Sequence, residues 1–344
     1  MENYKNDIYD RVIVNYDHDF VENDDNGATA SYVILCEFDA QNDFSKPIYD
    51  LNVLGLSFYD WVAMACDTKP ARVHTSKDEK FINLIKPYMG GFDYTVVLYA
   101  DTPLVSKSHL KDLIGFVSRK GLNVCKLKRG YILKNEYVSE VEDIYSSLVY
   151  DLSSNDFMQV KSLSDFDNVK DILEKRIFNH FKKNGVTFSN QNTTTIDANV
   201  SISSGCVIGG NVSIINNSTI GENVIIETGA VVSNSKIENN AIIGTGANVS
   251  SSVVKTGAEI KTDSSVVSSV LGQNSKVGIG SRVVKSAIND FAKVDDFVNL
   301  KNVNVLNGAT VGAGSIIIGD GVVVAIEEDS TINAGTKLVK KNNQ

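Results

Sequence analysis

Aliphatic residues recur at fixed intervals through the second half of the chain. Between Ile196 and Val232 they fall on every sixth position. From Ile220 onward three columns repeat every 17 residues. The columns are Ile220, Ile237, Val254, Leu271, Ile288 and Val305; Ile226, Ile243, Ile260, Val277, Val294 and Val311; and Val232, Val249, Val266, Val283, Leu300 and Ile317. Three columns with one period predict a three-faced solenoid from about Ile196 to Val339, with aliphatic ladders inside. A flat β-sandwich, the alternative, requires no constant period.

The positions between the columns suit the corners of such a tube. Small residues stand two positions before many column members, where a tight corner leaves little room: Ala230, Ala241, Ala247, Ala258, Ser264, Ser275, Ser281, Ala292, Ala309 and Ser315. Asn and Gly fill other corner positions, for example at Asn216, Asn217 and Gly246, and both residue types tolerate left-handed backbone. We interpret the Ser and Asn rows as turn chemistry. A flat Thr/Asn face that binds ice or a glycan is the alternative.

A helix is predicted from Ser164 to Gly185, directly before the repeats. Ser164 and Asp167 have the spacing of a capping box, and Gly185 suits the stop. One face is apolar and consists of Phe166, Val169, Leu173, Ile177 and Phe181. We expect this helix to cap the open end of the solenoid.

The residues before this helix have an α/β pattern. Buried strands are predicted at 31–36 and 94–100, and helices at 58–66 and 106–117. The second strand ends at Asp101-Thr102-Pro103-Leu104. Ligands and metals often bind at the carboxyl ends of strands in such sheets, so Asp101 is a candidate ligand; its alternative role is that of a turn residue.

Composition narrows the choice of partners. The net charge of −9 argues against nucleic acid and anionic membranes as main partners. The N-terminus lacks a secretory pattern, and no apolar run reaches the length of a membrane span. Cys36, Cys66, Cys125 and Cys206 are scattered, which is typical of free thiols in a reducing cytoplasm. We therefore expect a cytoplasmic protein.

Several motifs resemble the bifunctional uridyltransferase/acetyltransferase family that makes UDP-N-acetylglucosamine in bacteria. The segment 175–180, the exit Gly185-Val186-Thr187-Phe188 and the entry Thr195-Ile196-Asp197 match best. In front, 100–104 resembles the family motif G-D-x-P-L, and Gly130 in Arg129-Gly130-Tyr131-Ile132 resembles its N-x-G sugar segment. The specific match covers residues 160–230, beyond which only the repeat register agrees.

The resemblance implies a fold, an assembly and a site. The fold is a nucleotidyltransferase-like (Rossmann-like) α/β domain over 1–160, a linker helix over 161–190 and a left-handed parallel β-helix over 191–344. The assembly is a homotrimer. The site is a sugar-nucleotide pocket with Lys46, Thr102 and Gly130 as binding residues and Asp101 as the ligand of Mg²⁺.

The departures from the family concern the groups that do chemistry. Where the family has a glycine-rich nucleotide loop with an arginine, this chain has 35–43, which lacks glycine and brings in Glu37, Asp39 and Asp43. In the solenoid, Ile279 replaces the family's catalytic histidine, Arg282 its tyrosine and Val267 a lysine, and no histidine follows His180. A general base that titrates near neutral pH is therefore missing.

Three hypotheses follow. The first is a degenerate, non-catalytic relative that binds a sugar nucleotide or acts as a trimeric scaffold, with no catalytic residue and no acetyl transfer. The second is an active Mg²⁺-dependent sugar-1-phosphate nucleotidyltransferase that uses Asp101 and Lys46. The third is a purely structural rod. His74, His109 and His180 are expected to be surface, structural or packing residues.

Overall fold

The computed structural model describes residues 12–15, 27–37, 44–75, 80–142, 144, 148–151 and 155–342. Contacts divide the chain into two compact units, Met1–Leu173 and Glu174–Gln344. The domain boundaries expected near residues 160 and 190 stay predictions. No helix in the described ranges is both long and apolar enough to cross a bilayer.

The first unit is built on a mixed seven-stranded sheet in the order β1-β9-β7-β8-β6-β2-β5. Its strands are β1 (Val12–Asn15), β2 (Ala30–Cys36), β5 (Ala71–His74), β6 (Tyr94–Tyr99), β7 (Val124–Leu127), β8 (Gly130–Lys134) and β9 (Leu148–Asp151). A separate hairpin pairs β3 (Asn52–Val53) with β4 (Leu56–Ser57). Strand β8 is antiparallel to β6 and β7, whereas the other pairs are parallel.

Helices cover both faces of this sheet. They are α2 (Phe58–Met64), α3 (Phe81–Ile85), α4 (Lys107–Arg119) and α5 (Asn135–Glu140), with 3₁₀ turns η1 (Ile48–Asp50), η2 (Lys86–Tyr88) and η3 (Asn155–Phe157). Alternate residues of β2 enter different cores, because successive side chains of a strand point to opposite faces. Ile34 packs in the core that includes α4, and Val33 packs in the core that includes α3. The predicted strands and helices are confirmed, but the nucleotidyltransferase-like assignment stays a prediction.

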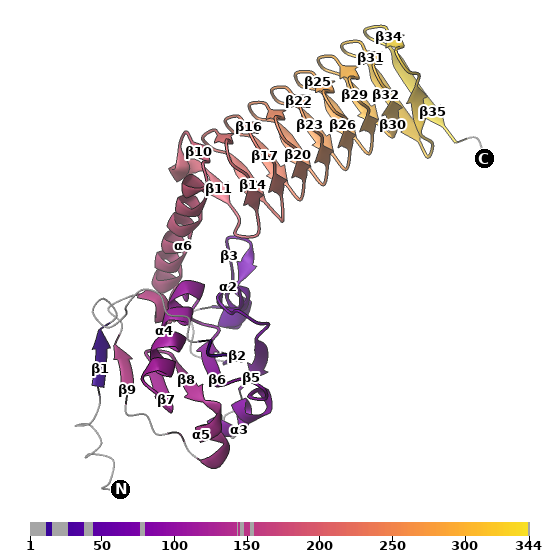
Figure 1. Cartoon of the computed structure of the whole chain (residues 1–344). Helices are drawn as coiled ribbons and strands as arrows, with labels where there is room; N and C mark the ends of the chain where they lie inside the picture. The colour runs from indigo at the N-terminus through magenta and orange to yellow at the C-terminus, as the bar shows by residue number, and fades with distance from the viewer. Residues whose placement is uncertain are drawn as a thin grey trace. The chain divides into compact units, whose positions relative to one another are not determined.

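The second unit is a parallel β-solenoid of about nine turns over residues 187–341 (Figure 1). One sheet contains β10 (Thr187–Phe188), β13 (Val207–Ile208), β16 (Ile225–Ile226), β19 (Ile242–Ile243), β22 (Glu259–Ile260), β25 (Lys276–Val277), β28 (Lys293–Val294), β31 (Thr310–Val311) and β34 (Thr331–Ile332). The next contains β11 (Thr195–Ile196), β14 (Ser213–Ile215), β17 (Val231–Ser233), β20 (Asn248–Ser250), β23 (Ser265–Val267), β26 (Arg282–Val284), β29 (Asn299–Lys301), β32 (Ile316–Asp320) and β35 (Lys337–Lys341). The last contains β12 (Ser201–Ile202), β15 (Thr219–Ile220), β18 (Lys236–Ile237), β21 (Val253–Val254), β24 (Val270–Leu271), β27 (Ala287–Ile288), β30 (Val303–Val305) and β33 (Val324–Ile326). A 3₁₀ turn, η4 (Gln191–Thr193), precedes β11. The expected β-helix is thus present as a parallel solenoid, and its left-handed sense stays a prediction.

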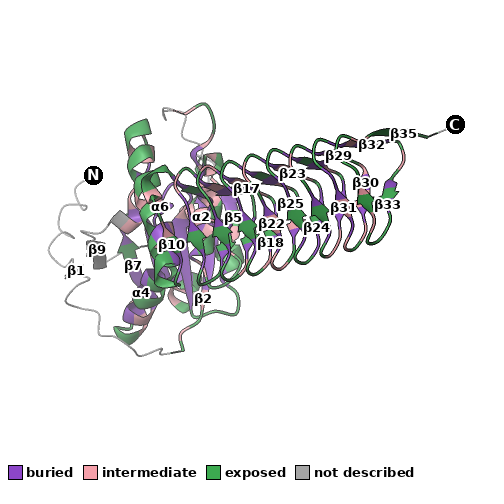
Figure 2. Ribbon diagram, turned by 90° about the horizontal axis from the view of Figure 1, so that it is seen from above, coloured by how far each residue is buried: buried purple, intermediate pink, exposed green. Residues whose placement is uncertain are grey.

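The aliphatic columns form the ladders that their spacing predicts. Ile237 pairs with Val254, and Val254 pairs with Leu271, each in parallel register. These three side chains are at most 1% exposed. Along most solenoid strands a buried position follows an exposed or half-buried one (Figure 2). The solenoid interior is therefore a continuous apolar core in which each coil buries its residues against its neighbours.

Coil length changes twice along the solenoid. Ile202 pairs with Ile220, 18 positions later, whereas Ile220 pairs with Ile237 after 17. Near the end, Val305 pairs with Ile326 after 21 positions. Both changes keep the inward ladders in register, because the residues lost or gained lie at corners.

The corners use two kinds of glycine or asparagine. Asn216 and Asn217 have φ of 56° and 57°, and Gly246 has φ of 67°, which confirms the left-handed conformation expected there. Gly244 is different, because its φ is not positive. A Cβ atom on Gly244 would lie 2.8 Å from the carbonyl oxygen of Ile260 in the next coil, so this glycine permits close approach between coils.

A buried serine column lines the shortest corner, and the sequence analysis did not recognise it. Its members are Ser218, Ser235, Ser252, Ser269 and Ser286, all at most 7% exposed. The hydroxyl of Ser269 donates to the carbonyl of Val267 at 2.8 Å and accepts from the N–H of Ser286 at 3.1 Å. Each hydroxyl thereby satisfies a backbone N–H in the following coil that would otherwise be buried without a partner.

Helix α6 (Leu163–Lys183) precedes the solenoid, close to the predicted bounds. Its capping box is formed by Ser162 and Asp165, two residues earlier than predicted. The Ser162 hydroxyl accepts from the Asp165 N–H at 3.2 Å, and the Asp165 carboxylate accepts from the Ser162 N–H at 3.0 Å. The Lys161 N–H also donates to the Asp165 carboxylate, at 3.0 Å. This hydrogen bond, followed by those from Ser162, lowers the pKa of Asp165. Towards the other end of α6, Phe178 and Phe181 join the solenoid core, as expected of a cap.

The serine column generates a stability prediction. We expect Ser269→Ala to lower the free energy of unfolding of the solenoid by about 1–3 kcal/mol, because the N–H of Ser286 loses its buried acceptor. Ser201→Ala, the same change at an exposed strand position, is expected to stay within about 0.5 kcal/mol. Thermal unfolding and amide hydrogen exchange at Ser286 measure the effect. Equal stability and equal exchange in the two variants would contradict the role given to the column.

Candidate functional site

Three strand ends meet at one edge of the sheet in the first unit. Strands β2 and β6 are parallel, so Glu37 after β2 and Asp101 after β6 lie at the same edge. Strand β8 runs the opposite way and therefore begins at this edge. Arg129 immediately precedes β8, in the short connection from β7. The mixed topology thus brings one cation and two carboxylates together from distant parts of the chain.

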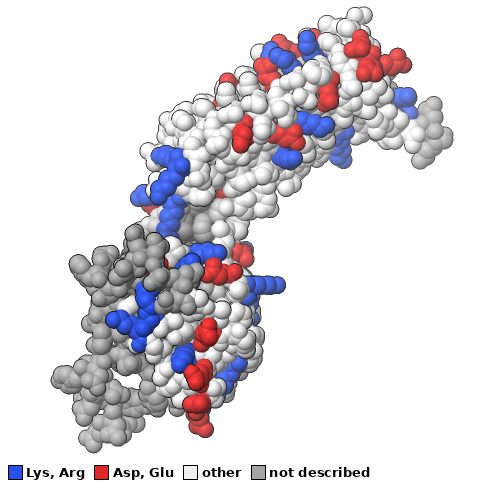
Figure 3. Space-filling model, viewed as in Figure 1, with Lys and Arg blue, Asp and Glu red and all other residues white. Residues whose placement is uncertain are grey.

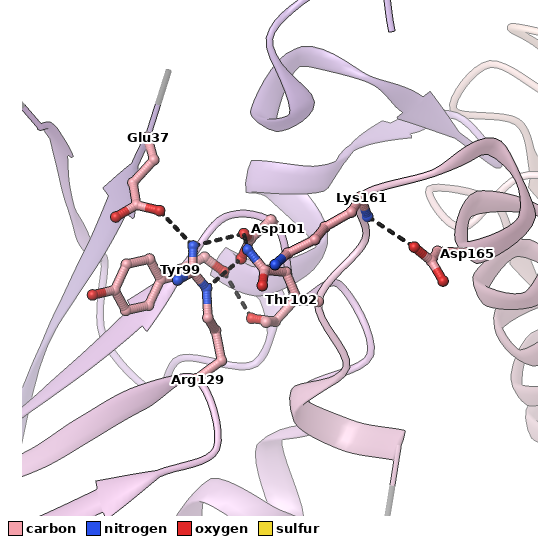
Figure 4. A network of polar contacts seen from close by, with 8 residues as sticks. Glu37, Tyr99, Asp101, Thr102, Arg129, Lys161 and Asp165 are labelled. Carbon is pink, nitrogen blue, oxygen red and sulfur yellow. Dashed lines mark hydrogen bonds and ion pairs between the residues drawn. The ribbon is translucent and has the colours of Figure 1, made fainter. Parts of the chain in front are cut away.

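Arg129 is the centre of a polar network with Asp101 (Figure 4). Its Nε donates to Oδ1 of Asp101 at 3.2 Å, and its Nη2 donates to Oδ2 at 2.8 Å. The same Nη2 donates to Glu37. The Gln159 amide donates to Oδ2 of Asp101 at 2.7 Å. Both oxygens of Asp101 are therefore engaged by donors of this chain.

Packing and charge hold the guanidinium in place. Its central carbon lies 3.9 Å from the centre of the Tyr99 ring, a cation–π contact. Burial favours a lower pKa for Arg129, but hydrogen bonding and attraction from Asp101, and then from Glu37, raise the pKa overall. Burial, followed by the charge of Glu37, raises the pKa of Tyr99 to about 12. Arg129 is thus charged and Tyr99 is neutral at physiological pH.

Little space remains at this edge. The cavity there has a volume of about 20 Å³ and is lined by Glu37, Tyr49, Tyr99, Asp101, Arg129 and Gln159, together with aliphatic residues. That volume suits about one water molecule. The side chains of Arg129 and Asp101 are 22% and 11% exposed, whereas that of Glu37 is 43% exposed. Among the described residues, the arrangement is an ion-pair network in which Glu37 is the more exposed carboxylate.

Two of the predicted binding residues have structural roles here. Thr102 is fully buried, and its hydroxyl donates to the carbonyl of Tyr99 at 2.7 Å, within the turn that follows β6. Gly130 has φ of +138°, and a Cβ atom there would lie 2.5 Å from the carbonyl oxygen of Val97 on β6. Strand pairing thus requires glycine at position 130. Their roles in ligand binding stay predictions.

The residues expected at the phosphate loop are only partly described. Lys46 is exposed in a bend just before Pro47, and no contact between described residues joins it to the Asp101 network. Asp39 and Asp43 lie outside the described residues. Glu37 is described and points its carboxylate at Arg129 (Figure 4).

The residues at Asp101 do not fit a magnesium ion. Mg²⁺ requires near-octahedral oxygen ligands, but N–H donors of Arg129 and Gln159 face both oxygens of Asp101. The described residues contain no group of three or more His, Cys, Asp or Glu side chains that could hold a metal ion. The Mg²⁺ expected from the resemblance stays an untested prediction.

In the solenoid, the replaced positions carry no recognisable acid–base chemistry. The Ile279 side chain is 40% exposed, and its N–H donates to the Asp296 carboxylate at 2.8 Å. Arg282 is an exposed residue of β26, and Val267 is half-buried at the end of β23. The absence of acetyl transfer stays a prediction.

The other chemically reactive side chains that the structure describes lie mostly in buried or packed positions. Burial raises the pKa of Cys66 and of Cys125 to about 12, and all four cysteines are unpaired. His109 is 4% exposed, and its Nδ1 is hydrogen-bonded to the Asp156 carboxylate. His74 contacts the ring of Tyr49 edge-on.

Sequence reasoning missed the central role of Arg129 and Gln159. Arg129 was noted only as the neighbour of Gly130, and Gln159 was not singled out. The available indication was a basic residue in a short connection between two apolar strands. This indication points to Asp101 only when β8 runs antiparallel to β6, because the connection before β8 then lies at the same sheet edge as Asp101.

No family model matches the chain, and no curated protein matches it significantly. Among solved structures, it is similar to the acetyltransferase domain of PglB from Neisseria gonorrhoeae, with 16% identity and a TM-score of 0.17. That match covers 41% of this chain and 54% of the other, so this chain spans about half of that structure. It is also similar to a mutant of GDP-perosamine N-acetyl transferase from Caulobacter crescentus in complex with CoA and GDP-perosamine, with 13% identity and a TM-score of 0.14 over 90% of this chain and 93% of the other. At these scores neither likeness supports an argument about activity.

The steric role of Gly130 can be tested directly. We expect Gly130→Ala to destabilise the first unit by about 1–3 kcal/mol, because the added methyl group overlaps a backbone carbonyl on β6 and the φ angle disfavours alanine. Gly90→Ala is the control, since nothing lies within 4 Å of its Cβ position and its φ is not positive. Thermal unfolding compares the two. Unchanged stability of Gly130→Ala would contradict the steric role and favour the binding role.

Proposed function

We propose that the protein is a non-catalytic relative of sugar-1-phosphate nucleotidyltransferases and hexapeptide-repeat transferases, which acts as a trimeric scaffold that binds a sugar nucleotide. The observation that carries the proposal is the engagement of Asp101. The resemblance assigns the catalytic metal to this carboxylate, yet Arg129 and Gln159 donate to both of its oxygens. A nucleotidyltransferase has to neutralise a triphosphate, and the charged residue that the described part of the replaced loop places beside this network is the anionic Glu37.

The solenoid supports the scaffold part of the proposal. Its interior is closed by aliphatic ladders and by the serine column, so each coil has its polar backbone groups satisfied against the next. Three outward aliphatic residues, Val207, Ile225 and Ile242, pair across neighbouring coils and are 36–41% exposed. Charged side chains are sparse over the first coils and gather over the later ones (Figure 3). We propose that copies of the chain pack along this aliphatic stripe, because contiguous exposed apolar surface favours association.

An active Mg²⁺-dependent nucleotidyltransferase is the alternative. Asp101 stands at the carboxyl end of β6, a place where ligands bind in α/β sheets. In that case the contacts between Arg129 and Asp101 have to open when substrate binds. The purely structural rod is the other alternative, and it differs from the proposal only in binding no ligand.

Turnover measurements separate these alternatives. With Mg²⁺, each nucleoside triphosphate and a panel of sugar 1-phosphates, we expect pyrophosphate release no faster than without protein, because Arg129 and Gln159 engage both oxygens of Asp101. We also expect no transfer from acetyl-CoA to glucosamine 1-phosphate. Turnover that Asp101→Ala abolishes would establish the enzyme instead. A thermal-shift series with UDP-sugars then distinguishes binder from rod, since a ligand at a hundred times its Kd adds about 2.7 kcal/mol.

Light scattering tests the assembly. We expect the mass of three chains for the natural protein and of one chain for the double variant Ile225→Asp, Ile242→Asp, because carboxylates in an apolar interface lose hydration without gaining partners. Thr219→Asp, at an exposed strand position of another sheet, is the matched control and is expected to stay trimeric. A natural protein with the mass of one chain, or a double variant that remains trimeric, contradicts the assembly.

A further inference from the structure

The charge balance at the strand edge depends on a side chain of the protein itself. Glu37 and Asp101 bring two negative charges close together, and Arg129 contacts both. Like charges that share one guanidinium repel each other, and the repulsion grows where they are partly buried. A cation that contacts both carboxylates relieves this repulsion, and the chain supplies it as a guanidinium.

The guanidinium also matches this position in shape. Its planar fork engages Asp101 through Nε and Nη2, the two-point geometry that a carboxylate favours. Its flat face lies on the ring of Tyr99. A divalent ion could satisfy the same charges but could not stack on the ring, so the aromatic contact favours the guanidinium.

We infer that Arg129 is a built-in counter-cation that excludes divalent metal ions from the site, and that loss of its charge exposes a metal site formed by Glu37 and Asp101. This inference rests on the proposed function and on the same contacts. It adds that the Arg129 guanidinium occupies the position that a metal ion would take. Without the guanidinium, the site offers the oxygens of two carboxylates. The Gln159 amide, turned over, supplies a third ligand, because its oxygen and nitrogen are interchangeable in shape. Carboxylate and amide oxygens are ligands that Mn²⁺ and Mg²⁺ accept.

Full-length variants and Mn²⁺ as the probe test the inference. The central variant is Arg129→Met, which keeps an unbranched apolar stem and removes the charge. Electron paramagnetic resonance of free Mn²⁺ measures binding, and the shift in unfolding temperature with Mn²⁺ or Mg²⁺ gives a second readout. We expect no saturable site in the natural protein and one saturable site per chain in Arg129→Met, with an affinity at least about tenfold above any weak binding by the natural protein.

Controls assign any new site to these residues. The double variant Arg129→Met, Asp101→Asn is expected to lose the site. Arg129→Lys is expected to exclude Mn²⁺ as the natural protein does, because it keeps the charge. Arg72→Met removes another arginine that lies over a tyrosine ring and pairs with a single carboxylate, Asp50, and is expected to gain no site.

Each outcome decides the matter. A natural protein that binds Mn²⁺ through Asp101, or a folded Arg129→Met that binds none, overturns the inference. If Arg129→Met does not fold, Arg129→Gln, which keeps an N–H donor for Asp101, takes its place. Failure of both neutral variants to fold even with Mn²⁺ also overturns it, because the metal should restore the charge balance. Metal binding by the natural protein without turnover contradicts this inference only, whereas turnover that survives Asp101→Asn contradicts only the proposed function.

Discussion

Parallel pairing between successive coils is the constraint on which the solenoid depends. A single coil has three short strands and no partner within itself for their backbone groups or for its inward side chains. Both needs are met when the next coil repeats the same positions, as Ile237, Val254 and Leu271 do. Every other property of this unit, including the small corner residues and the buried serines, follows from the need to keep coils in register at close distance.

This constraint explains why the sequence predicts the solenoid well. An inward ladder restricts residue type at each repeat, so the period of 17 can be read directly. Two details escaped prediction. The pattern of Ser followed by Asp three residues later occurs at both Ser162 and Ser164, and only the coordinates show which pair caps α6. The serine column resembles ordinary turn chemistry, and its burial depends on how tight the corner is.

The strand edge in the first unit was predictable only in part. A strand followed by Asp101 was correctly expected, because a buried strand and the turn after it are local features. The partner of Asp101 was not, because Arg129 reaches it only when β8 reverses direction beside β6. Strand direction within a mixed sheet depends on tertiary packing, and hydrophobic patterning does not record it. The structure gives Thr102 the role of a turn hydroxyl and Gly130 that of a sterically required glycine, and the binding roles that the resemblance implies for them stay predictions.

The uniform coil length in the middle of the solenoid has a consequence for how such a chain can vary. Removing or duplicating one complete coil leaves every remaining inward residue opposite an equivalent neighbour, so the change adds or subtracts about 4.8 Å of length with little else altered. A gain or loss of a single residue within a strand instead turns the ladder outward from that point. The middle of this unit can therefore be lengthened or shortened only by complete coils. The number of coils sets the length of the solenoid.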